Sequence, residues 1–259
     1  MSNSQNKIFV IDVGNTNIHW CFMENGNIQG EYKRNKHPEL SLLPWEEIKK
    51  QNCPVVIAGA LIHMNDAVKT IANDYKVSFM EMDISKQNII KNTYPTLGID
   101  RVCNLIASLK SFQGLKSPII IFDFGTATTI TSCDQDGKFL GGLITTGCEI
   151  ELKAISSKTL SLPHVELAKE QKIKKLNPLC NNTEDSILHG TITSQVALIE
   201  YYVNLFNKEV SPDAKIVFTG GNASIVSRFT NIKCDLHDPH LTIKGIYYCY
   251  QSSLVNSNS

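Results

Sequence analysis

The sequence predicts an α/β protein built from two similar halves. Each half begins with a continuous apolar strand that ends in Asp-x-Gly, first at Asp12 and again at Asp123. A dipeptide that favours tight turns, Asn25-Gly26 or Asp136-Gly137, follows 13 residues after each aspartate. Segments with helical spacing then alternate with short apolar strands. Two aligned features of this kind indicate an internal duplication.

The first half is expected to continue beyond its hairpin with a strand at 54–58, a helix around 63–75 and a strand near 77–81. Apolar residues at helical spacing predict a further helix over 100–112. Asp100 stands where it would cap the N-terminus of that helix.

The second half is expected to form helices over 147–160 and 184–207, with a lysine-rich irregular segment at 164–182 between them. A strand at 215–219 ends in a glycine turn, and a helix over 241–254 ends the pattern. We therefore expect two domains, residues 1–115 and residues 116–259, with a cleft between them.

The composition narrows the possible partners. The chain has 259 residues, of which 42 % are hydrophobic and 19 % charged, and 25 basic residues balance 25 acidic ones. A neutral chain with three arginines gives no support for coating nucleic acid, and no apolar run approaches the roughly 20 residues that span a bilayer. The eight cysteines are scattered, which indicates reduced thiols and a cytoplasmic location.

The two Asp-x-Gly turns have the chemistry of a nucleotide-phosphate site. Glycine lets the backbone approach phosphate oxygens, and short polar side chains can donate hydrogen bonds to them. Carboxylates repel phosphate but hold the cations that bridge to it. The candidate donors are Asn15, Thr16, Thr126 and Thr128, and the candidate cation ligands are Asp12 and Asp123. The alternative is that each turn is only a tight hairpin corner.

These motifs resemble those of a known superfamily. Asp12-Val-Gly-Asn-Thr16, Asp123-Phe-Gly-Thr-Ala-Thr128 and Thr219-Gly-Gly221 are similar to the two phosphate motifs and the adenosine motif of the actin/Hsp70/sugar-kinase ATPases. That resemblance implies the duplicated actin-like (ribonuclease H-like) ATPase fold. Gly98-Ile-Asp100-Arg101 narrows it to the type III pantothenate kinases, whose motif order the chain follows from residue 8 to about 246.

The resemblance implies ATP-dependent phosphorylation of pantothenate to 4'-phosphopantothenate, the first step of coenzyme A biosynthesis. Asp100 would be the general base. The substrate would contact Tyr94, Gly98, Ile99, Asp100, Arg101 and Thr183. ATP would contact Asp12, Val13, Gly14, Asn15, Thr16, Asn17, Ile18 and His19, with Thr126, Gly220 and Gly221.

The resemblance also implies cofactors and an assembly. Asp123 would hold a monovalent cation, K⁺ or NH₄⁺, and Asp12 is a possible ligand of Mg²⁺. The family forms homodimers, in which Thr183 would reach the neighbouring subunit's site.

Several alternatives stay open at this point. Asp100 could be only a helix cap, and Arg101 only a solvated cation. Cys148 follows Thr-Gly at an expected helix N-terminus, where a thiol can acidify, but it has no evident His–Asp partner. The chain could also be another small-molecule kinase, such as a sugar kinase, or a non-catalytic regulator on the same fold.

The chain departs from the family pattern at three positions. Val102 replaces a common Trp, Thr146-Gly147 replaces Pro-Gly, and Thr131 stands where an Asp is frequent. The first two are expected to change packing or a turn, and the third a position that faces the cleft.

Overall fold

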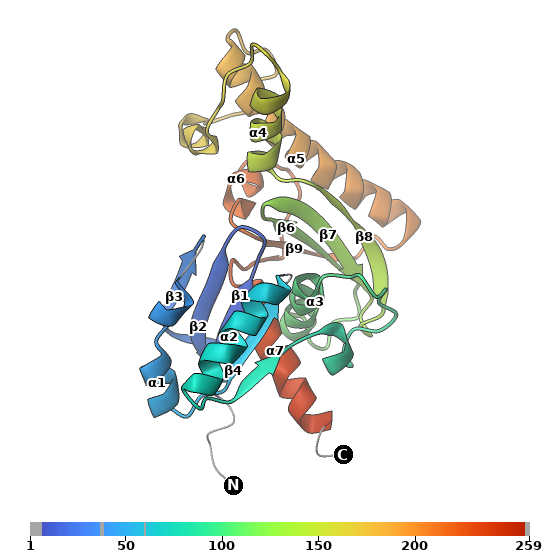
Figure 1. Ribbon diagram of the computed structural model, residues 1–259. Helices are drawn as coiled ribbons and strands as arrows, with labels where there is room; N and C mark the ends of the chain where they lie inside the picture. Colours follow the sequence, from blue (N-terminus) through green and yellow to red (C-terminus); the bar gives the residue numbers. More distant parts are fainter. Residues whose placement is uncertain (1–6, 37–38, 60, 257–259) are drawn as a thin grey trace. The chain divides into compact units, whose positions relative to one another are not determined.

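The computed structural model describes residues 7–36, 39–59 and 61–256 (Figure 1). They form two compact units. The first contains the described residues up to Leu115, together with Asp136–Phe139 and the residues from His240 on; the second contains Lys116–Gln135 and Leu140–Pro239. The change of unit after Leu115 coincides with the expected boundary, but the C-terminal helix packs with the first unit. The domains 1–115 and 116–259 stay a prediction.

The first unit contains a five-stranded sheet in the order β3-β2-β1-β4-β5. Strand β1 pairs antiparallel with β2 and parallel with β4, while β2–β3 is antiparallel and β4–β5 parallel. Asn25 and Gly26 have φ of 50° and 78°, so the β2–β3 connection uses the left-handed backbone that Asn-Gly predicts. The strands are β1 Lys7–Val13, β2 Ile18–Glu24, β3 Asn27–Asn35, β4 Val55–Gly59 and β5 Phe79–Glu81.

The second unit repeats this design, with a sheet in the order β10-β9-β6-β7-β8. Its first strand, β6, pairs antiparallel with β7 and parallel with β9, as β1 does with β2 and β4. Replacing β1 to β5 by β6, β7, β8, β9 and β10 converts one sheet order into the other, so the predicted duplication is confirmed. The strands are β6 Ile119–Phe124, β7 Ala127–Cys133, β8 Phe139–Thr146, β9 Lys215–Thr219 and β10 Leu236–His237.

The helices lie close to their expected positions. None of those in the described part of the chain is long and apolar enough to cross a membrane. The α-helices are α1 Trp45–Lys50, α2 Ile62–Asp74, α3 Ile99–Ser111, α4 Cys148–Lys158, α5 Thr183–Glu209, α6 Ala223–Ser227 and α7 Leu241–Asn256. Short 3₁₀ turns are η2 Leu40–Leu42, η3 Ile84–Lys86 and η4 Leu167–Lys172.

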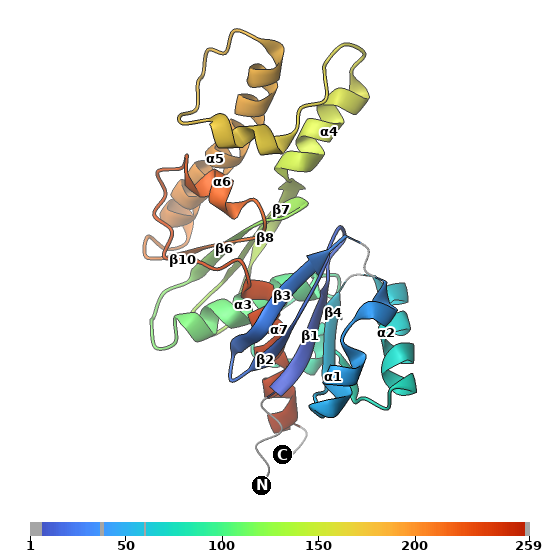
Figure 2. The same cartoon turned by 90° about the vertical axis from the view of Figure 1, so that its left-hand side faces the viewer.

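In the first unit, helices cover both faces of the sheet (Figure 2). Trp45 of α1 is 1 % exposed and stacks on Tyr75 with ring centroids 5.7 Å apart, in the core under one face. On the other face α7 packs against α3, β1 and β4. A Cβ added at Gly245 would overlap the backbone of Cys103, so α7 approaches α3 more closely than a larger residue would allow.

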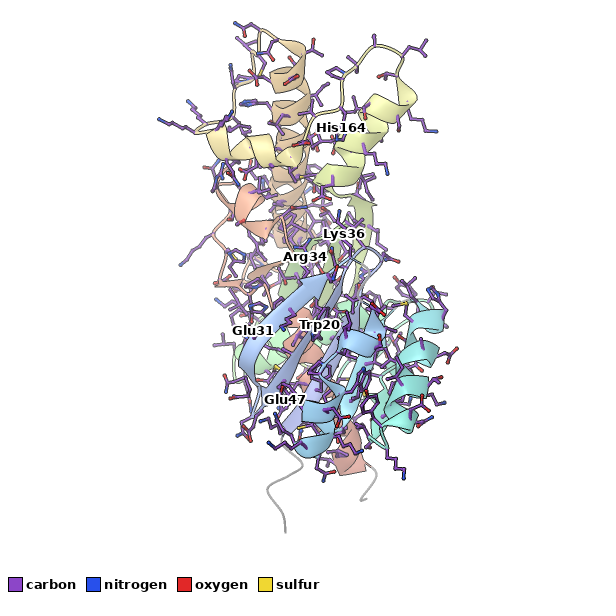
Figure 3. The ribbon with its side chains drawn as sticks, turned by 60° about the vertical axis from the view of Figure 1, so that its left-hand side comes forward. Trp20, Glu31, Arg34, Lys36, Glu47 and His164 are labelled. Atoms are coloured by element: carbon purple, nitrogen blue, oxygen red, sulfur yellow. The ribbon has the colours of Figure 1, made fainter. Side chains whose placement is uncertain are left out.

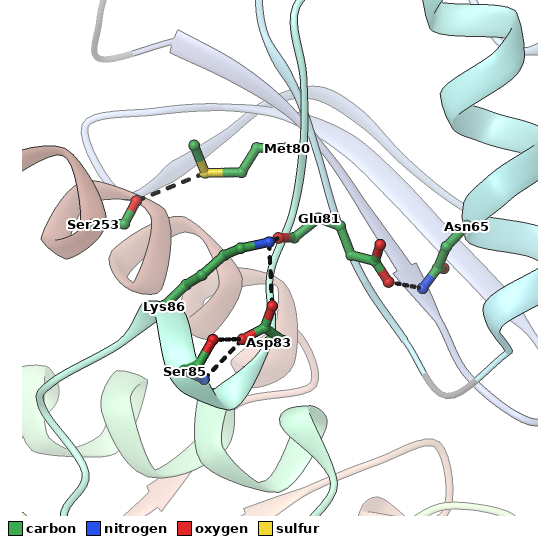
Figure 4. A network of polar contacts seen from close by, with 7 residues as sticks. All are labelled: Asn65, Met80, Glu81, Asp83, Ser85, Lys86 and Ser253. Carbon is green, nitrogen blue, oxygen red and sulfur yellow. Dashed lines mark hydrogen bonds and ion pairs between the residues drawn. The ribbon is translucent and has the colours of Figure 1, made fainter. Parts of the chain in front are cut away.

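Polar contacts join the edge of this sheet to its helices (Figure 4). Lys86 donates to the backbone oxygen of Glu81 at 2.6 Å and pairs with Asp83 at 3.2 Å. Asn65 of α2 donates to the Glu81 carboxylate at 2.7 Å, and Ser253 of α7 donates to the sulfur of Met80 at 3.7 Å. These bonds hold β5 between the two helices.

The core of the second unit lies between its sheet and α5. Phe122, Phe124 and Phe218 project from neighbouring strands, and Phe218 meets each of the others edge to face. Ile192, Ile199 and Val203 of α5 pack against this aromatic group. The apolar runs at the start of the repeat and in 215–219 are therefore buried strands, as the sequence predicts.

Candidate active site

The first predicted phosphate turn joins β1 to β2. The backbone N–H of Gly14 donates to the oxygen of Asn17 at 3.0 Å, and a Cβ at Gly14 would lie 2.9 Å from that oxygen. Asn15 is exposed, whereas the side chains of Val13 and Ile18 are buried. The turn therefore needs glycine, and it presents backbone and short polar groups.

Asp12 and His19 stand directly opposite each other at the base of this turn. Nδ1 of His19 is hydrogen-bonded to the Tyr32 hydroxyl, and the Tyr32 ring lies 4.2 Å, centroid to centroid, from the ring of His240. Burial, together with the nearby charges of Arg34 and His240, lowers the pKa of His19 to about 4. His19 is therefore neutral at pH 7.

Asp100 lies in the first turn of α3, at the surface. The helix begins at Ile99 and its N-cap is Gly98, so the expectation that Asp100 caps the helix is wrong. Gly98 has the extended backbone of a cap, φ −61° and ψ 136°, so the cap lies two residues earlier than expected. A Cβ at Gly98 would overlap a carboxylate oxygen of Asp100, so glycine leaves room for that carboxylate.

Arg101 is not a solvated surface cation, because only 5 % of it is exposed. Its Nη1 donates to the hydroxyl of Tyr94 at 3.1 Å. The Tyr94 ring is 42 % exposed and meets the ring of Phe139 edge to face at 5.8 Å. The structure thus brings together two residues that the sequence analysis assigned to the substrate, beside the exposed Asp100. Val102, which replaces a Trp that is common in the family pattern, is fully buried, so this difference lies in the core.

Asp123 lies in a cradle of glycines in the second unit. Gly220 has φ of +89°, and a Cβ there would lie 2.5 Å from a carboxylate oxygen of Asp123 and 2.6 Å from the Phe124 carbonyl carbon. Asn222 donates its backbone N–H to Phe124 at 3.0 Å. Glycine at 220 therefore serves two needs: a left-handed backbone and close approach to the second phosphate turn.

The same turn is approached from its other side by Gly147. Its N–H donates to the backbone oxygen of Thr126 at 3.1 Å, and a Cβ there would lie 2.5 Å from the oxygens of Gly125 and Thr126. The departure at Thr146-Gly147 thus keeps the glycine that this contact needs. Thr126 itself is exposed, as a phosphate-contacting residue requires.

Two expectations for the second sheet are wrong. Thr128 is 1 % exposed and donates to Gln195 of α5 at 2.7 Å, so its hydroxyl serves the core rather than a phosphate. Gln195 in turn donates to the backbone oxygen of Thr146 at 3.1 Å. Thr131 is buried opposite Ile121 in the interior of the sheet, so it does not face a cleft.

Thr183 is the first residue of α5, and it is exposed. Asn182 caps the helix by accepting the backbone N–H of Asp185 at 2.9 Å. Thr183 borders a surface depression with Leu162, Cys180, Asn181, Asn182, Ser186 and Ile187.

Comparison with known proteins decides the family. The profile of the type III pantothenate kinases matches residues 8–205, which is most of the chain. The chain belongs to this family. It is therefore an ATP-dependent kinase, and the predicted duplicated fold is confirmed.

Solved structures similar to this kinase are distant in sequence but share its fold. The ethanolamine utilization protein EutJ from Carboxydothermus hydrogenoformans is 14 % identical, with a TM-score of 0.52 over 93 % of this chain and 89 % of that one. MreB5 of Spiroplasma citri bound to ADP is 11 % identical, with a TM-score of 0.52 over 99 % and 100 %. The activator of 2-hydroxyisocaproyl-CoA dehydratase from Clostridium difficile, with bound ADPNP, is 12 % identical, with a TM-score of 0.51 over 97 % of both chains.

The carboxylates of this kinase fit cations that are shared with a nucleotide. No group of three or more His, Cys, Asp or Glu side chains that could hold a metal occurs among the described residues. Mg²⁺ in kinases is bound through one or two carboxylates and the substrate phosphates, so a dedicated cage is not needed. The cradle at Asp123 offers one carboxylate, an oxygen ligand of the kind that hard cations take.

The sequence analysis missed Tyr32, although it included the residue that Tyr32 contacts. The available signal in the sequence was Gly30, two residues earlier, because glycine inside a strand often marks a bulge. In the structure Gly30 has φ of +73°. The sequence analysis also named Gly147 in the Thr146-Gly147 difference from the family pattern, but it did not predict the contact of Gly147 with Thr126.

Proposed function

We propose that this kinase transfers the γ-phosphoryl group of ATP to the primary hydroxyl of pantothenate and forms 4'-phosphopantothenate, the first step of coenzyme A biosynthesis. The main support for this proposal is the Gly98–Arg101 segment, which lies within the residues that match the family. Its glycine makes room for an exposed carboxylate at Asp100, and the buried Arg101 is bonded to Tyr94 directly beside it.

Asp100 is assigned as the general base. It accepts the proton of the pantothenate hydroxyl while the oxygen forms a bond to the γ-phosphorus and the bond to the ADP oxygen breaks. Base catalysis of this kind contributes roughly 10²–10⁴-fold. The exposed position of the carboxylate in the first turn of α3 supports this role, because an incoming hydroxyl can reach it.

Arg101 and Tyr94 are assigned to binding pantothenate, with Gly98 and Ile99. Pantothenate carries a carboxylate, and a buried guanidinium that is already held by one hydrogen bond is preorganised to bind such an anion.

The ATP-contacting residues are assigned in each unit separately. In the first unit they are Asp12, Val13, Gly14, Asn15, Thr16, Asn17, Ile18 and His19; in the second they are Thr126, Gly220 and Gly221. The turns around Gly14 and Gly220 support this assignment, because each presents backbone where a side chain would block approach. Bound Mg²⁺ would neutralise charge on the phosphates, with Asp12 as a candidate ligand.

Asp123 is assigned to a monovalent cation, K⁺ or NH₄⁺. Gly220 passes close to its carboxylate, where the Cβ of any larger residue would displace it. A cation there would offset the repulsion between this carboxylate and a phosphate.

We also propose a homodimer, in which Thr183 reaches the neighbouring subunit's site. The exposed apolar side chains on β8, just after α4 and in the loop before α5 are the candidates for its interface. Ile144 is 64 % exposed, and Leu143, Leu160 and Leu179 are exposed as well.

The eight cysteines all lie in the described residues and form no disulfide, which supports a cytoplasmic location.

The proposal is tested by identifying the product. Purified protein, ATP, Mg²⁺ and K⁺ are incubated with pantothenate or with a panel of sugars, and products are detected by ³¹P NMR and mass. We expect a phosphomonoester of pantothenate and none of the sugars. Phosphorylation of a sugar would make this another small-molecule kinase, and nucleotide binding without any turnover would favour the regulator.

A further inference from the structure

A bulge in β3 places Tyr32 beside the first phosphate turn. His19 and Trp20 of β2 pair with Arg34 and Lys33, but the next residue pair in register is Phe22 with Gln29. Cys21 alone therefore stands opposite three residues of β3, from Gly30 to Tyr32. Gly30 has φ of +73° and open space around its Cβ position, so it is the backbone that makes the bulge, not crowding.

The bulge brings the Tyr32 hydroxyl to Nδ1 of His19. Both side chains lie on the face of the sheet that carries Asp12, and Tyr32 is held from its other side by the ring of His240, which precedes α7. The charged groups around the pair are Asp12 from β1 and Arg34 from β3. Figure 3 labels Arg34 on β3. Tyr32 is thus held between β2 and the residue that precedes α7.

We infer that Tyr32 is a positioning residue that fixes the tautomer of His19. A phenol is a strong donor and a neutral imidazole has one acceptor nitrogen, so the Tyr32 hydroxyl donates to Nδ1 and the proton of the ring resides on Nε2. The structure thereby makes His19 a hydrogen-bond donor at the end of the turn that is assigned to the ATP phosphates. A phosphate oxygen accepts hydrogen bonds only, so the opposite tautomer would present it with an acceptor.

This inference rests on the nucleotide-binding part of the proposed function and not on the acceptor substrate. The test uses Tyr32→Phe, which removes one oxygen and keeps the ring against His240. Tyr75→Phe is the matched control, because Tyr75 also packs in the first unit but stacks on Trp45, in the core on the other side of the sheet.

Each variant is examined by NMR, calorimetry, thermal unfolding and steady-state kinetics. ¹⁵N NMR of the histidine rings reports the tautomer of His19, assigned by comparison with His19→Gln. Calorimetry with Mg²⁺ and a non-hydrolysable ATP analogue reports nucleotide affinity, and thermal unfolding shows that the variants are folded.

We expect Nε2–H in the wild-type chain and a mixture of tautomers in Tyr32→Phe. The variant should bind the analogue about 2–5-fold more weakly, because only the fraction of molecules with the Nε2–H tautomer is competent to bind. The KM for ATP should rise by a similar factor, with the KM for pantothenate unchanged, and Tyr75→Phe should match the wild type in every measurement.

The inference is overturned by an Nδ1–H tautomer in the wild-type chain, or by unchanged nucleotide affinity in Tyr32→Phe. Absence of nucleotide binding by the wild-type chain would overturn both this inference and the proposed function. Nucleotide binding without phosphorylation of pantothenate would overturn only the latter.

Discussion

At the scale of single residues, glycines decide where the charged groups lie. Gly98 leaves room for the Asp100 carboxylate, and Gly220 allows the backbone to pass close to Asp123. The aspartates alone do not show this, because the room for each carboxylate comes from the neighbouring glycine. The short motifs Gly-x-Asp and Thr-Gly-Gly therefore have a steric reason: the glycine makes the space in which the carboxylate is held.

Replacing Gly98 by Ala should lower turnover without unfolding the protein. The backbone at Gly98 has φ −61° and ψ 136°, which alanine adopts freely, so the conflict is confined to the Asp100 side chain. We expect kcat to fall roughly 10–100-fold, because displacing a reacting group by about an ångström costs this much. Steady-state kinetics and a thermal melt measure the two effects. A variant with wild-type kcat would show that the position of this carboxylate does not matter.

Cys148 should be inert towards alkylation in the folded protein. Burial raises the pKa of its thiol to about 11, although it lies at the start of α4, so desolvation exceeds any acidification by the helix. At pH 7.5 its thiolate is on the order of one molecule in a thousand or fewer. Iodoacetamide followed by peptide mass analysis should therefore label the partly exposed Cys180 first. Rapid native labelling of Cys148 would mean that the site opens readily.

At the scale of elements, the sequence predicted the repeated features and missed those that depend on distant contacts. The two Asp-x-Gly strands and their hairpins are local patterns, so the duplicated sheets could be predicted. The bulge at Gly30 and the two-residue strand Leu236–His237 leave no periodicity to detect. Thr128 resembles a phosphate ligand in sequence, and only the position of Gln195, 67 residues later, shows that its hydroxyl is committed to the core.

The packing of α7 on α3 should depend on glycine at 245. Gly245→Ala is expected to destabilise the protein by about 1–3 kcal/mol, because the new methyl group meets the Cys103 backbone, which cannot move as a side chain would. Gly190→Ala is the control: it also lies inside a helix, but nothing surrounds its Cβ position, and alanine there should stabilise by about 0.5–1 kcal/mol.

Urea unfolding of both variants measures the difference. Opposite signs for two Gly→Ala changes within helices separate packing from helix propensity, which favours alanine in both. Equal stabilisation by the two variants would contradict the close α3–α7 approach.

At the scale of the whole molecule, the proposed dimer makes each site depend on two chains. Two inactive variants should then complement each other. In a heterodimer of Asp100→Asn with Thr183→Val, one site carries both changes and the other neither, as two-fold symmetry requires. Random mixing after dissociation and reassociation should restore about a quarter of wild-type activity at limiting pantothenate, because about half of the dimers are mixed.

The assay is pantothenate phosphorylation before and after mixing, with each variant alone as the control. Activity that stays at the level of the separate variants would show that Thr183 serves its own subunit or none.

The most direct test of the account is ATP consumption by the wild-type chain and by Asp100→Asn, with Mg²⁺ and pantothenate, in K⁺ and again in Na⁺. Loss of the base should lower kcat by roughly 10²–10⁴-fold while nucleotide affinity is kept. The account predicts turnover that requires pantothenate, is supported by K⁺ but not by Na⁺, and collapses in the variant. Turnover that is independent of pantothenate, or unchanged in Asp100→Asn, would contradict it.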